Sequence, residues 1–444
     1  MNKLLLLAAT AISCSSLIYA EKLKKSPIDS VPSFQESILP IKLIGVLEVE
    51  ANSFLQSNRD TQNKSGFNDK FAIKTGGAIA AIFEKNLTET LKYGAKITFR
   101  TTTLPKGSPK FNGSHIYLEN AKWGKVTFGA DYDAMAGYSV TGLSAAVAKG
   151  GSSACEISGK VKTNSTTTDI KFSPYYLFTL DSSLRPLALD EGSTVEPSRK
   201  IVFYSPKLLK NRLQLVASFT PDSSNSGMLK TSTKKIGYKE LEGTSTTKYR
   251  IPLVATNVIS AAAVFENQIT PDVAIQVGAS FESGSAVQKY QSTTNSLPKP
   301  VIWDDLKECK VNNLFSWNLG AKVTYQNIAV ALSYANLGNA FGVSADSTIF
   351  PGLTTATQAL QDKDTTYLAA SLGYSIGEYA ISISGFKSIT QIIPFKFVAV
   401  GGEYKAAPNL KFFAEISYAW FNDGTPSASD ETGSALSMGT VLSF

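Results

Sequence analysis

Hydrophobic and polar residues alternate with a period of two along most of the chain, which predicts β-strands whose two faces meet different surroundings. Three stretches at 273–282, 315–326 and 410–420 show the pattern clearly, and their apolar faces begin or end on aromatic residues. In the first, the apolar face carries Val273, Ile275, Val277, Ala279 and Phe281. The sequence therefore predicts an all-β protein.

Sixteen segments fit this strand pattern. They lie near 41–52, 70–84, 92–102, 113–120, 124–131, 199–206, 211–220, 257–267, 273–283, 314–326, 328–337, 365–375, 379–388, 393–404, 410–420 and 434–444. Many run to about ten residues, roughly twice the usual length of a strand in a globular sheet. Strands of this length with an apolar face and aromatic ends are typical of transmembrane barrels, because aromatic rings favour the membrane interface. We therefore predict a sixteen-stranded antiparallel transmembrane β-barrel.

The chain ends on "GTVLSF", and its last residue is aromatic. Leu442 and Phe444 share the apolar face of the last predicted strand. A barrel must pair its last strand with its first, because a bilayer leaves no partner for an open sheet edge. We expect Phe444 to anchor the closed strand at the membrane interface.

The predicted connections alternate in length. Short ones lie at 120–124, 270–272, 326–327, 375–379 and 407–409, with a less compact one at 84–92. Long ones lie at 53–69, 132–198, 221–256, 284–313, 339–364 and 421–433. Short turns at one end and long loops at the other match the periplasmic and extracellular ends of such barrels.

Residues 1–20 have the features of a cleaved secretory signal peptide: a lysine at position 3, a short apolar stretch and a small residue, Ala20, before Glu21. No apolar run after residue 20 reaches the ~18 residues of a membrane helix. Residues 21–40, with three prolines and no strand period, are expected to form a periplasmic extension. The barrel is expected to occupy 41–444.

Charge and cysteine content narrow the possible functions. The net charge is +7 and the lysines are scattered, whereas a nucleic-acid-binding surface requires them clustered. Cys155 and Cys309 remain after removal of the signal peptide. Export permits a disulfide between them, but the sequence leaves the pairing open. Neither these thiols nor His115, the single histidine, suggests a metal site, and no cofactor is expected.

Four segments resemble the Gram-negative general porins. They are the first strand at 41–51, "NAKWGKVTFGADYDAM" at 120–135, "SRKIVFYSPKL" at 198–208 and the terminal "GTVLSF", which resembles the signal read by the outer-membrane barrel assembly machinery. The resemblance implies a homotrimer, surrounded by outer-membrane lipid and lipopolysaccharide, whose water-filled pore is narrowed by an inward-folded third loop. That loop, 132–198, is longer than usual for the family, which leaves room for an extra hairpin or a plug.

The selectivity of such a channel depends on the charges that line its narrow part. Strand parity places a basic ladder on one lumen wall: Lys70, Lys74, Lys92, Lys96 and Arg100. The long third loop supplies acidic residues that could face this ladder: Asp131, Asp133 and Glu156. This arrangement predicts a transverse field across the narrow part. The alternative is that these are ordinary solvated charges away from the narrowest point. The positive net charge and the lysines of the long loop 221–256 predict a weak anion preference.

No catalytic group is predicted. His115 and Ser114 are adjacent on a strand, so their side chains point to opposite faces and cannot act together. The leading hypothesis is an outer-membrane channel for passive diffusion of small hydrophilic solutes and ions. Two alternatives stay open: a channel specific for one solute class, and a plugged barrel acting as a surface adhesin or structural protein. A secreted soluble β-protein is disfavoured, because it has no reason to place aromatic residues at the ends of ten-residue strands.

Overall fold

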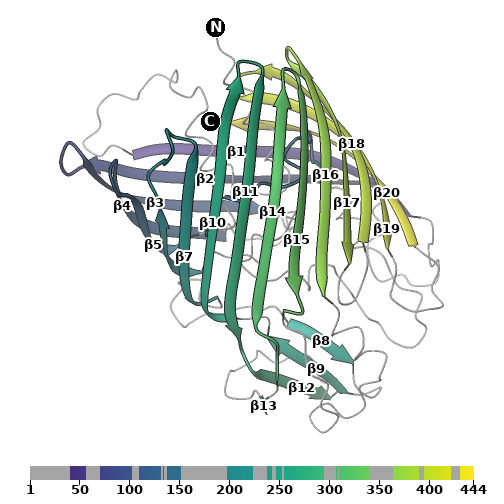
Figure 1. Cartoon of the computed structure of the whole chain (residues 1–444). Coiled ribbons are helices and arrows are strands. Elements are labelled where there is room, and N and C mark those ends of the chain that lie inside the picture. Colours follow the sequence, from purple (N-terminus) through teal and green to yellow (C-terminus); the bar gives the residue numbers. More distant parts are fainter. Residues whose placement is uncertain are drawn as a thin grey trace.

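Sixteen antiparallel strands form a closed barrel in the computed structural model of the protein (Figure 1). The structure describes residues 41–56, 71–102, 110–131, 134, 138–151, 198–223, 238–242, 247–252, 255–294, 307–308, 310–340, 364–389, 395–421 and 431–444. Each of the sixteen predicted segments overlaps one barrel strand, so the predicted fold class is confirmed. Within the described ranges, no helix is long and apolar enough to cross a membrane.

Every barrel strand pairs with its neighbour in chain order once the short strands β8, β9, β12 and β13 are set aside. The first eight barrel strands are β1 (Ile41–Gln56), β2 (Phe71–Asn86), β3 (Leu91–Thr102), β4 (Lys110–Asn120), β5 (Gly124–Ala130), β6 (Arg199–Tyr204), β7 (Leu213–Asp222) and β10 (Ala255–Thr270). The other eight are β11 (Val273–Ala286), β14 (Leu314–Tyr325), β15 (Ile328–Gly338), β16 (Thr365–Ile376), β17 (Tyr379–Ile389), β18 (Phe395–Ala407), β19 (Leu410–Phe421) and β20 (Glu431–Ser443).

The last strand closes the barrel against the first, as the sequence predicts. Leu442 stands opposite Leu47 in the β1–β20 register. Beyond β20, the backbone N–H of Gly45 donates to the carbonyl of Phe444 at 2.7 Å, and the N–H of Phe444 donates to the carbonyl of Gly45 at 2.9 Å. The Phe444 ring occupies the space where a side chain at position 45 would lie. The terminal aromatic residue therefore covers a glycine on the neighbouring strand.

The two faces of the wall differ in the way that a membrane barrel requires. On β16, the outward Leu368, Leu372 and Tyr374 are exposed, while the inward Tyr367 and Ser371 are buried. Large apolar side chains face outward around the barrel, whereas the inner face is mainly small or polar, with a stacked aromatic group formed by Tyr367, Phe386 and Phe397. Apolar side chains that would be unfavourable in water are stable against lipid, so this surface fits a bilayer.

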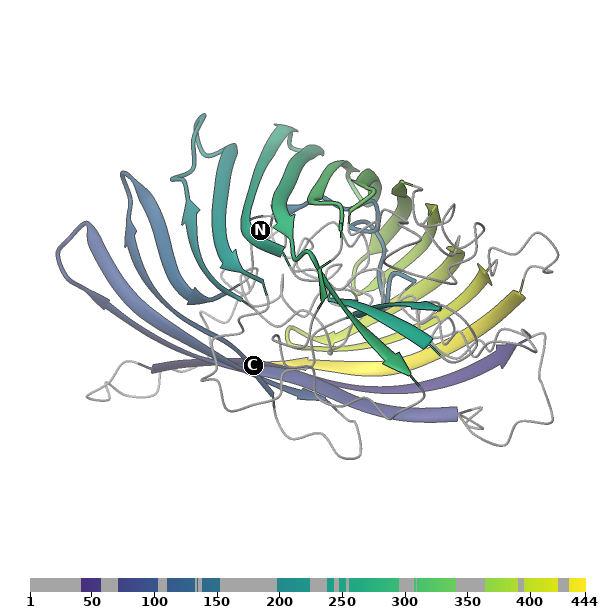
Figure 2. The same ribbon diagram turned by 90° about the horizontal axis from the view of Figure 1, so that it is seen from below.

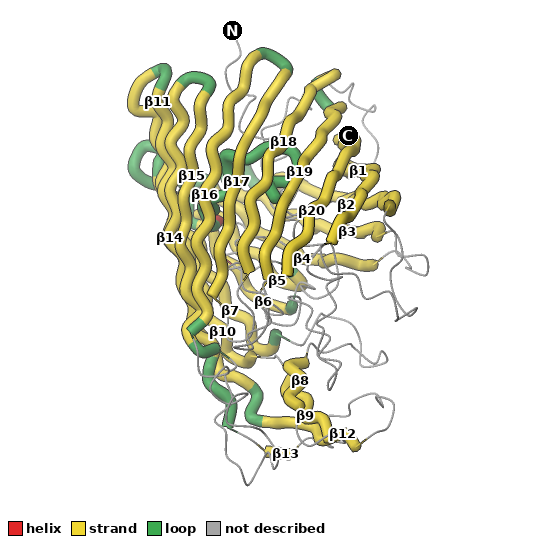
Figure 3. Tube along the Cα trace, turned by 90° about the vertical axis from the view of Figure 1, so that its right-hand side faces the viewer, coloured by secondary structure: helices red, strands yellow, loops and turns green. Residues whose placement is uncertain are grey.

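The two ends of the barrel differ in the length of their connections (Figure 3). One end, called here the short-turn end, carries tight turns such as 271–272, 326–327 and 377–378. It also carries the start of β1 and the end of β20, as an even number of strands requires. The opposite end, called the long-loop end, carries the long connections.

A second, four-stranded sheet lies beyond the barrel at the long-loop end (Figure 1). Its strands, in the order β13-β12-β9-β8, come from the two long connections that follow β7 and β11. They are β8 (Tyr238–Glu242), β9 (Thr247–Pro252), β12 (Lys289–Thr294) and β13 (Lys307–Glu308). The sequence analysis treated both connections as loops, because strands of two to six residues leave too short a pattern to recognise.

Candidate channel interior

Residues 138–151, called here the lumenal segment, follow β5 and lie against the inner wall of the barrel. The backbone N–H groups of Gly142, Ala145 and Val147 donate to the hydroxyl oxygens of three inward serines. The partners and distances are Ser333 on β15 at 2.7 Å, Ser371 on β16 at 3.2 Å and Ser382 on β17 at 2.8 Å. Because these serines lie on successive strands, the segment runs around the circumference of the wall rather than along it. Figure 2 shows the barrel from below.

Small residues on both sides permit this close approach. A side chain at Gly320 on β14 would collide with the carbonyl of Val140, and one at Gly373 on β16 would collide with the carbonyl of Ala145. On the segment, a side chain at Gly142 would collide with the carbonyl of Ala369. Backbone therefore packs on backbone, and the inward serines supply acceptors for the N–H groups that the segment cannot pair internally.

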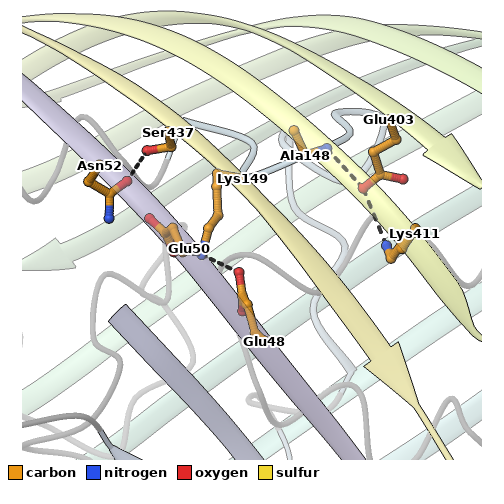
Figure 4. Close-up of polar contacts among 8 residues, drawn as sticks. All are labelled: Glu48, Glu50, Asn52, Ala148, Lys149, Glu403, Lys411 and Ser437. Atoms are coloured by element: carbon orange, nitrogen blue, oxygen red, sulfur yellow. Dashed lines mark hydrogen bonds and ion pairs between the residues drawn. The ribbon is translucent and has the colours of Figure 1, made fainter. Parts of the chain in front are cut away.

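A buried lysine fixes the far end of the lumenal segment to the first strand of the barrel. The ammonium nitrogen of Lys149 lies 2.6 Å from an Oε1 of Glu48 and also contacts Glu50 (Figure 4). The Lys149 side chain is 3% exposed, as is that of Glu50. Its ammonium group also lies 5.4 Å from the centre of the Phe413 ring. An amine this buried requires such partners, because desolvation of an unpaired charge is costly.

Carboxylates on β18 and β19 hold the backbone on either side of Lys149. The N–H of Ala148 donates to Glu403 at 3.0 Å, and the N–H of Gly151 donates to Glu415 at 2.9 Å (Figure 4 shows the first). Glu403 also pairs with Lys411 at 3.3 Å. Hydrogen bonds to charged acceptors are stronger than neutral ones, so this end is the most firmly held part of the segment.

The wall formed by β2–β5 carries inward bases and acids together. Lys92 pairs with Glu84 at 2.9 Å, and the Tyr117 hydroxyl donates to the same glutamate at 2.6 Å. Lys92 is in register with Glu119 on β4. Lys96 is in register with His115, and no ion pair involves Lys96 in the part of the chain that the structure describes. The expected basic ladder is thus partly neutralised by neighbouring carboxylates.

Asp131 lies on this same wall and not across the lumen from it. Its Oδ2 is 3.4 Å from Nδ1 of His115 and accepts a hydrogen bond from the Thr127 hydroxyl at 3.2 Å. The lumenal segment carries no acidic residue, and its one charged group, Lys149, is a base held by glutamates. The predicted opposition of a basic wall and an acidic loop therefore does not describe these residues.

The remaining predicted site residues are only partly visible. Lys74 is in register with Glu50 on β1, and Arg100 is in register with Ala78 on β2. The structure does not describe the side chains of Lys74 and Arg100. Three predicted pore-lining residues and both remaining cysteines lie outside the described residues: Lys70, Asp133, Glu156, Cys155 and Cys309. Within the described ranges, no group of three or more histidine, cysteine or acidic residues is placed to hold a metal ion.

The sequence analysis missed the residues that hold the lumenal segment. Glu48, Glu50 and Glu415 each stand on the polar face of a predicted strand, and nothing in the local sequence marks them as partners of a distant segment. The one available signal was the run "SAAVAKGG" at 144–151, which is apolar and small within a long, otherwise polar connection. Such a run indicates packing against a surface, but it does not show which wall receives it.

Comparisons with known proteins identify a family and several similar proteins. A family model described as Gram-negative porin matches residues 41–425. Uncharacterized proteins of Rickettsia conorii and Rickettsia bellii are 27% and 28% identical to the chain, covering 99% and 93% of it and 98% and 93% of their own lengths. A Salmonella typhi OmpF structure with daunomycin has a TM-score of 0.49 at 13% identity, covering 91% of this chain and 97% of its own. A mutant of Rh. blastica porin has a TM-score of 0.47 at 12% identity, covering 91% and 100%.

Proposed function

The chain belongs to the Gram-negative porin family, and we propose that it forms a water-filled channel for passive diffusion of small hydrophilic solutes and ions. The family and the barrel fold indicate the outer membrane. The observation that supports diffusion best is the lumenal segment, which lies against one side of the inner wall through backbone hydrogen bonds. A segment held to the wall narrows a channel, and the charges that remain in the lumen then set its selectivity.

The proposed selectivity is a weak preference for anions. Lys96 faces the lumen without an ion-pair partner among the described residues, whereas Lys92 and Lys149 are held by glutamates. Glu84, Glu119 and Asp131 reduce the field of the basic wall, so the preference is expected to be small. The lysines of the long connections attract anions over about one Debye length, ~8 Å in physiological salt, and therefore also favour anions.

The setting of the channel follows from the same family membership. We propose that residues 1–20 are removed on export and that the barrel assembly machinery recognises the terminal strand with Leu442 and Phe444. The short-turn end then faces the periplasm and the long-loop end faces the outside. Association as a homotrimer within a membrane that contains lipopolysaccharide is part of the proposal.

The test is single-channel conductance of the refolded mature protein in a planar bilayer, with a salt gradient to measure the reversal potential. Large ohmic steps that occur in threes are expected. The reversal potential is expected to have the sign that indicates a preference for anions over cations. A heat-denatured sample in the same detergent is the control. Folded, detergent-stable protein that gives no steps would contradict the channel and favour a plugged adhesin or structural barrel. A conductance that falls on addition of one solute class would instead indicate a specific channel.

A further inference from the structure

Two lysines lie side by side on the outer face of the barrel near the long-loop end. Lys387 on β17 is directly opposite Lys396 on β18, and both are exposed. They have the same outward parity as Ile383 and Val400, which are 47% and 50% exposed. Directly opposed side chains in an antiparallel pair have Cβ atoms ~4.5–5.5 Å apart, and like charges there repel. No ion pair to either lysine occurs among the described residues.

The position of the pair along the strands corresponds to a membrane interface. At the short-turn end of the same two strands, the rings of Tyr379 and Tyr404 stack with centroids 5.0 Å apart. Lys387 lies eight residues beyond Tyr379, which is about 26 Å along the strand at ~3.3 Å per residue, or ~20 Å of height for a strand tilted by ~40°. The apolar band of an outer-membrane barrel is about 25 Å tall. The tyrosine pair therefore marks one interface, and the long lysine side chains bring their ammonium groups to the other.

The surroundings of the pair combine an aromatic edge with a flat apolar surface. Trp420 on β19 stands opposite Lys396, and its ring packs edge-on against Tyr418 with centroids 4.6 Å apart. One outward position below Lys387 lies Gly385, where an added Cβ would meet only a carbonyl oxygen at 3.7 Å. The surface below the lysines is thus open at the depth where acyl chains begin. Aromatic residues at this level favour the headgroup region.

We propose that Lys387 and Lys396 bind the phosphate group of a lipid in the outer leaflet, with its acyl chains lying along β17 and β18 below Gly385. A phosphate between the two ammonium groups removes the repulsion that the strand register imposes. A lipid phosphate fits better than a free ion, because the lysines stand above an apolar surface at interfacial depth. The inference goes beyond the channel function and requires only that the long-loop end face outward.

The test is native mass spectrometry of the detergent-folded full-length mature protein titrated with diphosphoryl lipid A. The same lipid without its phosphates is the matched probe, and inorganic phosphate is the competitor. The wild type is expected to prefer the phosphorylated lipid. The double variant Lys387→Gln with Lys396→Gln is expected to bind it about 30-fold more weakly, since each lysine near an anionic headgroup contributes roughly one kcal/mol.

Two further variants distinguish loss of the lipid site from loss of the fold and from a general loss of positive charge. Lys85→Gln with Lys122→Gln removes two exposed lysines at the short-turn end and is expected to leave lipid affinity unchanged. Lys387→Glu is expected to lose the lipid while keeping full heat resistance, because it places opposite charges across the strand pair. Wild-type affinity in the double glutamine variant, or equal binding of the dephosphorylated lipid, would overturn the proposal. Complete displacement by millimolar inorganic phosphate would show an ion site and refute the lipid assignment.

Discussion

Replacing Lys149 with methionine tests whether the lumenal segment is held by the glutamates of β1. The substitution keeps the length of the side chain but leaves Glu48 and Glu50 without the ammonium group that lies 2.6 Å from the first of them. At an effective dielectric constant of ~20, one such pair attracts by about 6 kcal/mol before desolvation is counted. Measured losses on breaking a buried pair are smaller, about 3–5 kcal/mol.

The two glutamates also repel each other once the lysine is gone. Both carboxylates contact the same ammonium nitrogen, so their facing oxygens are at most about 5 Å apart, which corresponds to roughly 3 kcal/mol at the same dielectric constant. Two hydrogen bonds still hold the segment in the variant: the N–H of Ala148 donates to Glu403 and the N–H of Gly151 donates to Glu415, at about 1.5–3 kcal/mol each. A loss of 3–5 kcal/mol changes the equilibrium between held and released segment by roughly 100- to 4,000-fold. The released state is therefore expected to be about 100- to 4,000-fold more populated, relative to the held state, in the variant than in the wild type.

The assay is the single-channel current of the Lys149→Met variant. The wild type is expected to conduct at one steady level, and the variant to fluctuate between that level and others as the segment leaves the wall and returns. Lys96→Met is the control, because it removes an inward lysine that does not touch the segment: its reversal potential is expected to change while its current stays steady. Adding Glu48→Gln and Glu50→Gln to Lys149→Met is expected to restore part of the steadiness. A steady wild-type current in Lys149→Met alone would refute the tether.

Three further predictions follow from other contacts. Gly320→Val is expected to displace the lumenal segment, since the new side chain meets the carbonyl of Val140, and to change the conductance of a barrel that still resists heating in detergent. Asp131→Asn removes the carboxylate beside His115. It is expected to raise the anion-to-cation permeability ratio, measured from the reversal potential, about twofold, because one screened charge contributes a few tenths of a kcal/mol. Deleting Phe444 removes its two backbone hydrogen bonds to Gly45, about 2 kcal/mol, and is expected to lower the refolding yield seen by gel mobility.

The barrel could be predicted from the sequence because a bilayer imposes a strict rule on each strand. A segment such as 410–420 must place large apolar residues on one face along its whole length, because that face contacts lipid. Its backbone N–H and C=O groups must pair with neighbouring strands, because the bilayer core offers no other hydrogen-bond partner. All sixteen barrel strands carry that pattern, and their register follows from tight turns such as 326–327. The small sheet of β8, β9, β12 and β13 carries no such constraint, so it left no recognisable pattern.

The interior could not be predicted in the same way. Strand parity sets Lys92 and Lys96 on the same face of β3, but parity does not show that Lys92 pairs with Glu84 and that Lys96 is in register with His115. Lys149 lies about a hundred residues along the chain from Glu48 and Glu50, in a connection with no period. That contact exists only because the segment crosses the inner wall from β11 to β1. Local sequence holds no information on a contact that depends on the path of a long loop.

The charge arrangement has a consequence for selectivity that differs from the expected transverse field. A field across the lumen needs unpaired charges of opposite sign on facing walls, whereas Lys149 and its glutamates form one compact, buried cluster at the β1 side. The β2–β5 wall likewise pairs Lys92 with Glu84. Paired charges hold structure and contribute little field at a distance, so Lys96, which has no ion pair among the described residues, is expected to act on passing ions. The Lys96→Met control therefore also measures selectivity: loss of most of the anion preference in that one variant is the expected result, and an unchanged reversal potential would place the selecting charges elsewhere.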